Sequence, residues 1–75
     1  MTESSKTFPE LVKGVRRQLR ISQEELAHEL GVSVATINRW ENGKTKPFKL
    51  ARAQFDAFCE KMTERGKLKG LGGKS

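Results

Sequence analysis

Apolar and polar residues recur with helical spacing in four separate stretches of the chain. In the first, Thr7 and Glu10 lie three positions apart and form a capping box, which predicts the start of a helix. Its apolar residues then follow at intervals of three and four: Phe8, Leu11, Val12, Val15 and Leu19. This stripe predicts an amphipathic helix of about three turns that buries one face.

A second capping box, formed by Ser22 and Glu25, predicts the next helix. Three apolar residues lie on its buried face: Leu26, Ala27 and Leu30. Gly31 follows the last of them, at a place where helices commonly end with a residue of positive φ that glycine adopts without strain. A short helix and a tight turn are therefore expected over residues 22–32.

Ser33 can cap a third helix, which Asn42 and Gly43 end. Ile37 and Trp40 are the inward pair of this helix. Five residues are left pointing outward: Val34, Ala35, Thr36, Asn38 and Arg39. The third helix is thus expected to have a core side and a side free to read a ligand.

Pro47 opens the last apolar-periodic stretch, which continues to about Glu64. Its apolar residues are Leu50, Ala51, Phe55, Phe58 and Met62. With Phe48 added, this stretch carries more apolar surface than one small core is expected to need. Part of the stripe is therefore a candidate partner surface, and burial in the core is the alternative.

Two helices joined by a tight turn form a helix-turn-helix, in which the second helix lies in the DNA major groove. The chain contains S-Q-E-E-L-A at residues 22–27, L-G-V-S at 30–33 and T-I-N-R-W-E-N-G-K at 36–44. Across residues 10–50 it resembles the phage repressor and Cro-type (Xre) family. The fold class that follows is all-α, a compact lambda repressor-like bundle of about four helices with a central helix-turn-helix. The long last segment departs from the family, which usually has a shorter helix followed by a further one.

The resemblance implies roles for three residues outside the outward face. Arg16 and Glu41 match positions that commonly form an ion pair in the family, although two independent surface charges remain the alternative. Gln23 matches a glutamine that holds a phosphate oxygen, at a helix amino end where the dipole also favours an anion. A surface glutamine without a partner is the competing interpretation.

The outward face of the third helix offers the candidate DNA base contacts. Arg39 fits the O6 and N7 atoms of guanine, with a phosphate contact as the alternative. Asn38 could pair with adenine, and Thr36 with a phosphate or a thymine methyl group. Val34 and Ala35 stand where many relatives carry polar readers, so contacts to thymine methyl groups are expected there. Hydrogen-bond readout is then sparse, and specificity is either modest or dependent on DNA shape.

The loop after the third helix supplies further candidate phosphate contacts. Family members lay this loop along the sugar-phosphate backbone, which implies Asn42 as a donor and Lys44 and Lys46 as added charge. Solvated loop lysines are the alternative. The formal net charge of the chain is +6, and it is unevenly placed. Residues 1–30 carry five basic and five acidic residues, whereas residues 31–52 carry five basic residues against Glu41 alone. Such a patch suits phosphate, but it would also suit an acidic protein or an anionic membrane.

The length of 75 residues allows one small domain. We expect a flexible N-terminus at residues 1–6, the helix-turn-helix domain at 7–65 and a flexible basic tail at 66–75. No apolar run is long enough for a membrane span or a signal peptide, so no membrane partner is expected. Cys59 is the single cysteine, which is typical of a cytoplasmic protein. We expect its side chain to fill space in the apolar core.

An enzyme is not expected, because no nucleophile with a base, paired carboxylates or metal-ligand cluster appears. His28 has no second histidine or cysteine nearby, so no metal is expected, and neither is a cofactor or a small-molecule substrate. The predicted function is sequence-specific binding of double-stranded DNA by a transcriptional regulator, a repressor, with the helix from Ser33 to Asn42 in the major groove. The alternative is a protein-interaction module, such as a transcriptional bridging protein or an antitoxin-type partner binder.

A homodimer is expected at least on DNA, because one outward face offers too few contacts for a unique site. The candidate joint is the apolar surface around Phe55, Phe58 and Met62. A loop contact made only on DNA is the alternative.

Overall fold

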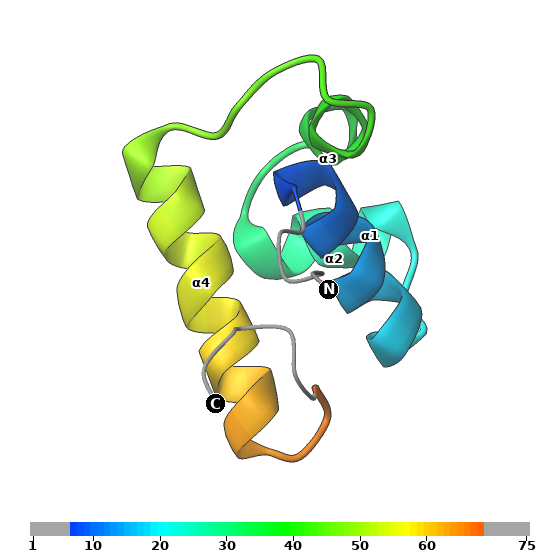
Figure 1. Ribbon diagram of the computed structural model, residues 1–75, viewed down its shortest axis with the longest axis vertical. Helices are drawn as coiled ribbons and strands as arrows, with labels where there is room; N and C mark the ends of the chain where they lie inside the picture. The colour runs from blue at the N-terminus through cyan, green and yellow to red at the C-terminus, as the bar shows by residue number, and fades with distance from the viewer. Residues whose placement is uncertain (1–6, 69–75) are drawn as a thin grey trace, which may run out of the picture.

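Four α-helices make up the computed structural model, which describes residues 7–68 (Figure 1). They are α1 (Phe8–Leu19), α2 (Gln23–Leu30), α3 (Val34–Glu41) and α4 (Lys49–Glu64). The predicted all-α fold, with a helix-turn-helix at its centre and one long last helix, is confirmed. Residues 1–6 and 69–75, for which a flexible N-terminus and most of a flexible tail were expected, lie outside the described residues.

The first three helices begin where the sequence places their caps. The Thr7 hydroxyl accepts the Glu10 backbone N–H at 3.4 Å, and the Glu10 carboxylate accepts the Thr7 N–H at 3.3 Å. Ser22 and Glu25 make the same pair of bonds at 3.0 and 2.7 Å. In each box two backbone donors that the helix cannot satisfy find side-chain acceptors. The starts of α1 and α2 are therefore determined by local contacts.

The ends of α1 and α2 use a left-handed residue in two different ways. Gly31 has φ 73° at the end of α2, as expected for a glycine in this position. Arg20 has φ 58° at the end of α1, and it is the one residue other than glycine with positive φ in the described chain. A side chain in this region carries a steric cost that glycine avoids. The tight connection between α1 and α2 imposes this conformation on an arginine.

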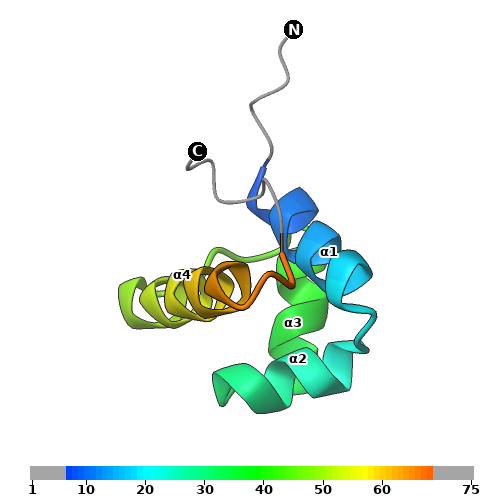
Figure 2. The ribbon, with the colours of Figure 1, turned by 90° about the horizontal axis from the view of Figure 1, so that it is seen from below.

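α3 lies against both α1 and α2, and α4 packs against α2 (Figure 2). All four helices contribute to one hydrophobic core, whose largest fully buried members include Val12, Leu26, Ile37 and Phe55. Phe8 joins the helices by edge-to-face contacts, with ring centroids 5.4 Å from Trp40 and 5.3 Å from Phe55. The outward face of α3 is held by this core at its back.

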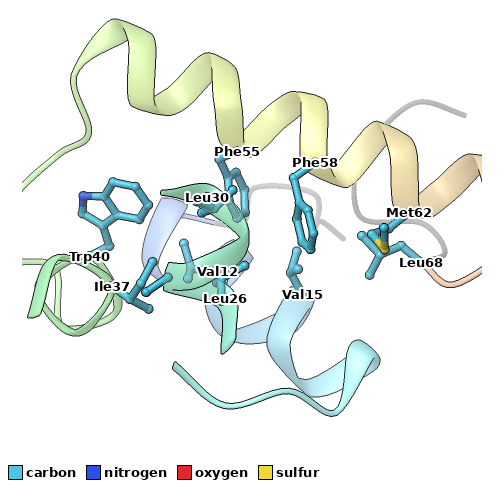
Figure 3. Close-up of a cluster of buried hydrophobic side chains, with 11 residues drawn as sticks. Val12, Val15, Leu26, Leu30, Ile37, Trp40, Phe55, Phe58, Met62 and Leu68 are labelled. Atoms are coloured by element: carbon cyan, nitrogen blue, oxygen red, sulfur yellow. The ribbon is translucent and has the colours of Figure 1, made fainter. Parts of the chain in front are cut away.

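The candidate dimer surface on α4 was wrong, because its residues belong to the core. Figure 3 shows Phe55, Phe58 and Met62 pointing from α4 toward the other helices, and their exposed fractions are 1%, 8% and 9%. Their spacing of three and four positions places them on a single helix face. Phe48 and Leu50 lie off that face and are 83% and 72% exposed. The surplus apolar surface exists, but it lies at the start of α4.

The domain also extends beyond the boundary expected at residue 65. After α4 the chain turns back, and the backbone N–H groups of Lys67 and Leu68 both donate to the Met62 carbonyl. Leu68 is then 2% exposed and packs into the core. The composition of this segment suggested a tail, but Leu68 is buried while Gly66 and Lys67 stay exposed.

Cys59 packs against the core and is half-buried, in agreement with an apolar role. Burial and, to a lesser extent, the nearby Asp56 carboxylate raise the pKa of its thiol to about 11, against a lowering effect of the Arg52 charge. The thiol is therefore protonated near neutral pH. Within residues 7–68, no helix is both long and apolar enough to cross a membrane.

Candidate nucleic-acid interface

α3 has a buried face and an exposed face along its whole length. Ile37, Trp40 and Glu41 are 0%, 2% and 6% exposed. The exposed residues are Val34, Ala35, Asn38 and Arg39, and Thr36 is half-buried. The candidate base contacts therefore share one side of the helix. Whether they touch DNA remains a prediction.

Two of the polar residues on this face are held by neighbours. The Asn42 side-chain amide donates to the Asn38 side-chain carbonyl at 3.1 Å. The hydroxyls of Ser33 and Thr36 lie 2.8 Å apart, and the Ser33 hydroxyl also accepts the Thr36 backbone N–H at 3.1 Å. The structure thus joins Asn38, a candidate base contact, to Asn42, a candidate phosphate contact. Fixing these side chains beforehand lowers the entropy cost of binding.

Arg39 is exposed, and its guanidinium makes no hydrogen bond or ion pair within residues 7–68. An arginine presents five N–H donors in a planar fork. All five are available here to a ligand that approaches the exposed face of α3.

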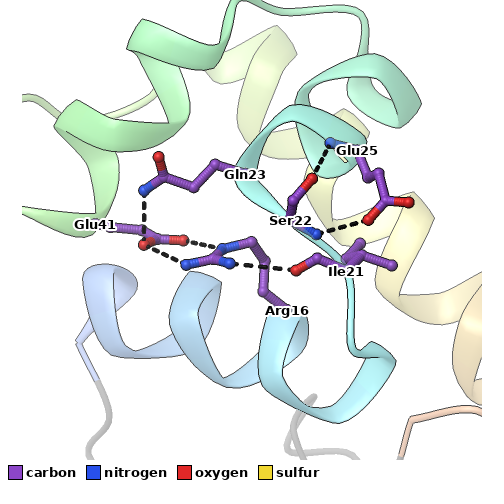
Figure 4. Close-up of polar contacts among 6 residues, drawn as sticks. All are labelled: Arg16, Ile21, Ser22, Gln23, Glu25 and Glu41. Carbon is purple, nitrogen blue, oxygen red and sulfur yellow. Dashed lines mark hydrogen bonds and ion pairs between the residues drawn. The ribbon is translucent and has the colours of Figure 1, made fainter.

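A polar cluster joins the end of α3 to the other two helices of the helix-turn-helix region (Figure 4). Arg16 of α1 donates from Nε to Glu41 Oε2 at 2.6 Å and from Nη2 to Oε1 at 3.0 Å. Its Nη1 donates to the Ile21 carbonyl at 3.2 Å. Gln23 of α2 donates from Nε2 to Glu41 Oε1 at 3.0 Å. The Arg16–Glu41 ion pair expected from the family resemblance is present, and Gln23 is a third residue bonded to Glu41.

Competing effects act on the ionisation of this pair. Burial alone would raise the pKa of Glu41, but hydrogen bonds from Arg16 and Gln23 and the charges of Arg16 and Lys13 together lower it. The hydrogen bond to Glu41 raises the pKa of Arg16 more than burial lowers it. Both groups are therefore held in their charged forms, and their ion pair connects α1 to α3.

Gln23, a candidate phosphate contact, also has a partner within the protein, which the alternative of a surface glutamine without a partner did not include. Its amide is bonded to Glu41, and of its two N–H donors one remains for a second acceptor. Sequence reasoning missed this contact. Gln23 and Glu41 are 18 positions apart, and no local pattern links a residue at the start of one helix to one at the end of another.

The loop after α3 is anchored at its base and exposed at its tip. The backbone N–H of Lys44 donates to the Arg39 carbonyl at 2.9 Å, and that of Gly43 to the Trp40 carbonyl at 3.2 Å. Lys44 and Lys46 are exposed, and neither side chain forms an ion pair within the described chain. Their positive charges therefore lie beside the carboxyl end of α3.

The comparisons with known proteins agree with this geometry. A family model described as helix-turn-helix matches residues 12–47, which run from within α1 through α2, α3 and the loop. No curated protein and no solved structure matches the chain. The protein contains a helix-turn-helix domain of the Xre, or lambda repressor-like, family of DNA-binding transcription regulators.

Proposed function

We propose that this protein is a sequence-specific repressor that binds double-stranded DNA with α3 in the major groove. The observation that carries the proposal is the division of α3 into two faces. One face is fixed in the core through Ile37 and Trp40, and the other is exposed and carries Arg39 without any internal partner among residues 7–68. The major groove of B-DNA admits a helix of this kind.

Base readout on this face combines one strong contact with several weak ones. Arg39 can bond two acceptors of a guanine, and Asn38 can offer its amide to an adenine. Val34, 42% exposed, and Ala35 can contact thymine methyl groups. This set would define only part of a site, so sequence-dependent DNA shape contributes the remainder.

Phosphate contacts around the carboxyl end of α3 would fix its register. Gln23 lies at the amino end of α2, where the helix dipole favours an anion. Asn42, Lys44 and Lys46 lie in the loop that leaves the carboxyl end of α3, the end at which Gln23 donates to Glu41. Phosphate contacts of this kind orient a reading helix without specifying a sequence. A protein held at a promoter in this way represses by occupying the site.

Two copies of the protein would bind the site as a two-fold dimer, with half-sites about 34–36 Å apart. We place the contact between the two copies at the start of α4, where Phe48 and Leu50 are exposed next to the loop lysines. This place adjoins the proposed DNA backbone contacts. Two such patches would therefore meet only when DNA holds both copies in register.

Selection of bound sequences from random duplex DNA tests the proposal. We expect one enriched motif with two inverted half-sites, and an affinity that falls steeply as salt is added. The absence of any enriched motif, together with salt-independent binding, would contradict DNA recognition and favour a protein-interaction module.

The dimer is tested separately on the selected site. Titration of the duplex should reach two proteins per site, and Phe48→Ser should weaken the second binding event more than the first. Saturation at one protein per duplex, with a footprint over a single half-site, would contradict the dimer while leaving DNA binding intact.

A further inference from the structure

A basic surface hollow of about 440 Å³ lies beside the Arg16–Glu41 pair. Four cationic residues line it: Lys13, Arg16, Arg17 and Arg20. Ile21 and Glu41 complete the wall. Four positive charges and one negative charge leave a local balance of +3, which is half of the formal charge of the whole chain. We call this feature the α1 basic pocket.

The single carboxylate of the pocket is already engaged. Both oxygens of Glu41 accept hydrogen bonds from Arg16, and one also accepts a bond from Gln23. Lys13, Arg17 and Arg20 form no ion pair within residues 7–68. Three cations without an ion-pair partner around one hollow create a positive potential, which attracts anions.

The pocket adjoins one end of the proposed DNA interface. Gln23, a proposed phosphate contact, donates to the same Glu41 side chain that forms part of the pocket wall. Figure 4 shows Gln23 and Arg16 both reaching the Glu41 carboxylate, Gln23 from α2 and Arg16 from α1. Gln23 and the pocket therefore share the Glu41 side chain, which connects the pocket to the proposed DNA interface.

A purely structural explanation accounts for only part of this arrangement. Cations in the last turn of a helix interact favourably with its dipole, and Arg16 and Arg17 lie in the last turn of α1. Arg20 lies beyond the helix, in a left-handed conformation that glycine would adopt at lower cost. The dipole favours a cation at this C-cap position too, but it does not explain why the strained backbone is not relieved by a glycine.

We propose that the α1 basic pocket binds a phosphate group through Lys13, Arg17 and Arg20. Arg16 stays bonded to Glu41 and shapes the wall. The phosphate has two possible sources: the DNA backbone flanking the site read by α3, or a small free phosphate compound. The first source rests on the proposed function, because it requires the protein to be on DNA, whereas the second does not.

Two variants test the pocket with little risk to the fold. Arg20→Gly removes a charge and also relieves the positive φ, so its melting temperature should equal or exceed that of the wild type. Arg17→Gln removes a second charge from an exposed position. The matched control, Lys61→Gln with Arg65→Gln, removes the same charge near the end of α4, away from the pocket.

The first measurement is the slope of log affinity against log salt, on the selected site with and without ten flanking base pairs at each end. Each neutralised phosphate contributes about 0.9 to this slope. If the source is the DNA backbone, Arg17→Gln with Arg20→Gly should reduce the slope by about 0.9 on the long duplex only. The control should leave the slope on both duplexes unchanged.

The second measurement is the melting temperature in pyrophosphate against sodium chloride of equal ionic strength. A rise for the wild type and the control, absent in the double variant, with unchanged DNA slopes, would assign the pocket to a free phosphate compound. No effect of the double variant beyond the control in either measurement would overturn the proposal. A wild type that binds no DNA would refute the proposed function alone, and pyrophosphate would then decide the pocket.

Discussion

Arg16 and Glu41 form a two-bond ion pair that joins α1 to the last residue of α3, with nitrogen–oxygen distances of 2.6 and 3.0 Å. Gln23 adds a bond from the start of α2, so three helices meet at one carboxylate. This junction connects the last turn of α3 to both α1 and α2. The pair is thus placed to affect both the stability of the fold and the presentation of the exposed face.

Removing either partner should therefore destabilise the protein. Arg16→Met leaves the buried Glu41 carboxylate without its charged partner and with little access to water. This change should lower the free energy of unfolding by about 3 kcal/mol. This is the lower end of the usual range, because the Arg16 side chain is still 25% exposed. Glu41→Gln should cost about 1.5–3 kcal/mol. The double variant should lose less than the sum, as measured by urea unfolding.

Asp56→Asn is the matched control for this cycle. Asp56 accepts a bond from Arg52 at 3.0 Å, but both side chains are exposed, so the change should cost less than about 1 kcal/mol. Additive losses from Arg16→Met and Glu41→Gln, no larger than that of the control, would show that the junction contributes nothing to stability.

The lowered pKa of Glu41 predicts a pH dependence with a definite sign. A carboxylate whose pKa is lower in the folded state stabilises the protein fully above its unfolded value, here 4.5, and less as the pH falls through the folded value. The difference in melting temperature between the wild type and Glu41→Gln should therefore be constant near neutral pH and shrink below pH 4.5. A difference that stays constant down to pH 3 would contradict the lowered pKa.

The sequence predicts those parts of the fold that short-range patterns determine. The two capping boxes at Thr7 and Ser22 fix helix starts, and the periodicity through Ile37 and Trp40 separates the faces of α3. These signals act between residues three or four positions apart, and they agree with the tertiary packing.

The errors arose where packing between distant segments decides the outcome. The stripe of Phe55, Phe58 and Met62 indicates a buried face, but not whether this domain or a second copy covers it. Leu68 is isolated among glycines and lysines, and only the turn back onto Met62 buries it. The Gln23–Glu41 bond and the α1 basic pocket likewise depend on how three helices meet.

Trp40 and Phe48 should respond in opposite ways to the same truncation. Trp40 is 2% exposed and contacts Phe8, so Trp40→Ala should cost about 3–5 kcal/mol and leave the small domain largely unfolded. Phe48 is 83% exposed, so Phe48→Ala should change stability by less than about 0.5 kcal/mol. Circular dichroism during thermal unfolding measures both. A folded Trp40→Ala protein with normal helicity would show that the two faces of α3 are wrongly assigned.

Lys44→Ala and Lys46→Ala should weaken DNA binding without changing sequence preference. Both lysines are exposed beside the end of α3, and each phosphate that is no longer neutralised should reduce the salt slope by about 0.9. The decrease in affinity should be equal on the selected site and on a scrambled duplex, because phosphate is the same in both. Lys61→Ala, a change on the far part of α4, is the control. Slopes equal to that of the control would remove both lysines from the interface.

Arg39→Ala should instead reduce specificity. The Arg39 fork has no internal partner among the described residues, so the substitution breaks no internal contact and the melting temperature should be unchanged. If the fork bonds the O6 and N7 atoms of a guanine, its removal should cost about 1–3 kcal/mol on the selected site. Preference at one base pair of each half-site should relax, while affinity for a scrambled duplex falls much less. Titration of wild type and variant against the four single-base versions of that position measures the effect. Equal decreases on all four would identify Arg39 as a phosphate contact and leave base recognition to Asn38, Thr36 and the apolar residues of α3.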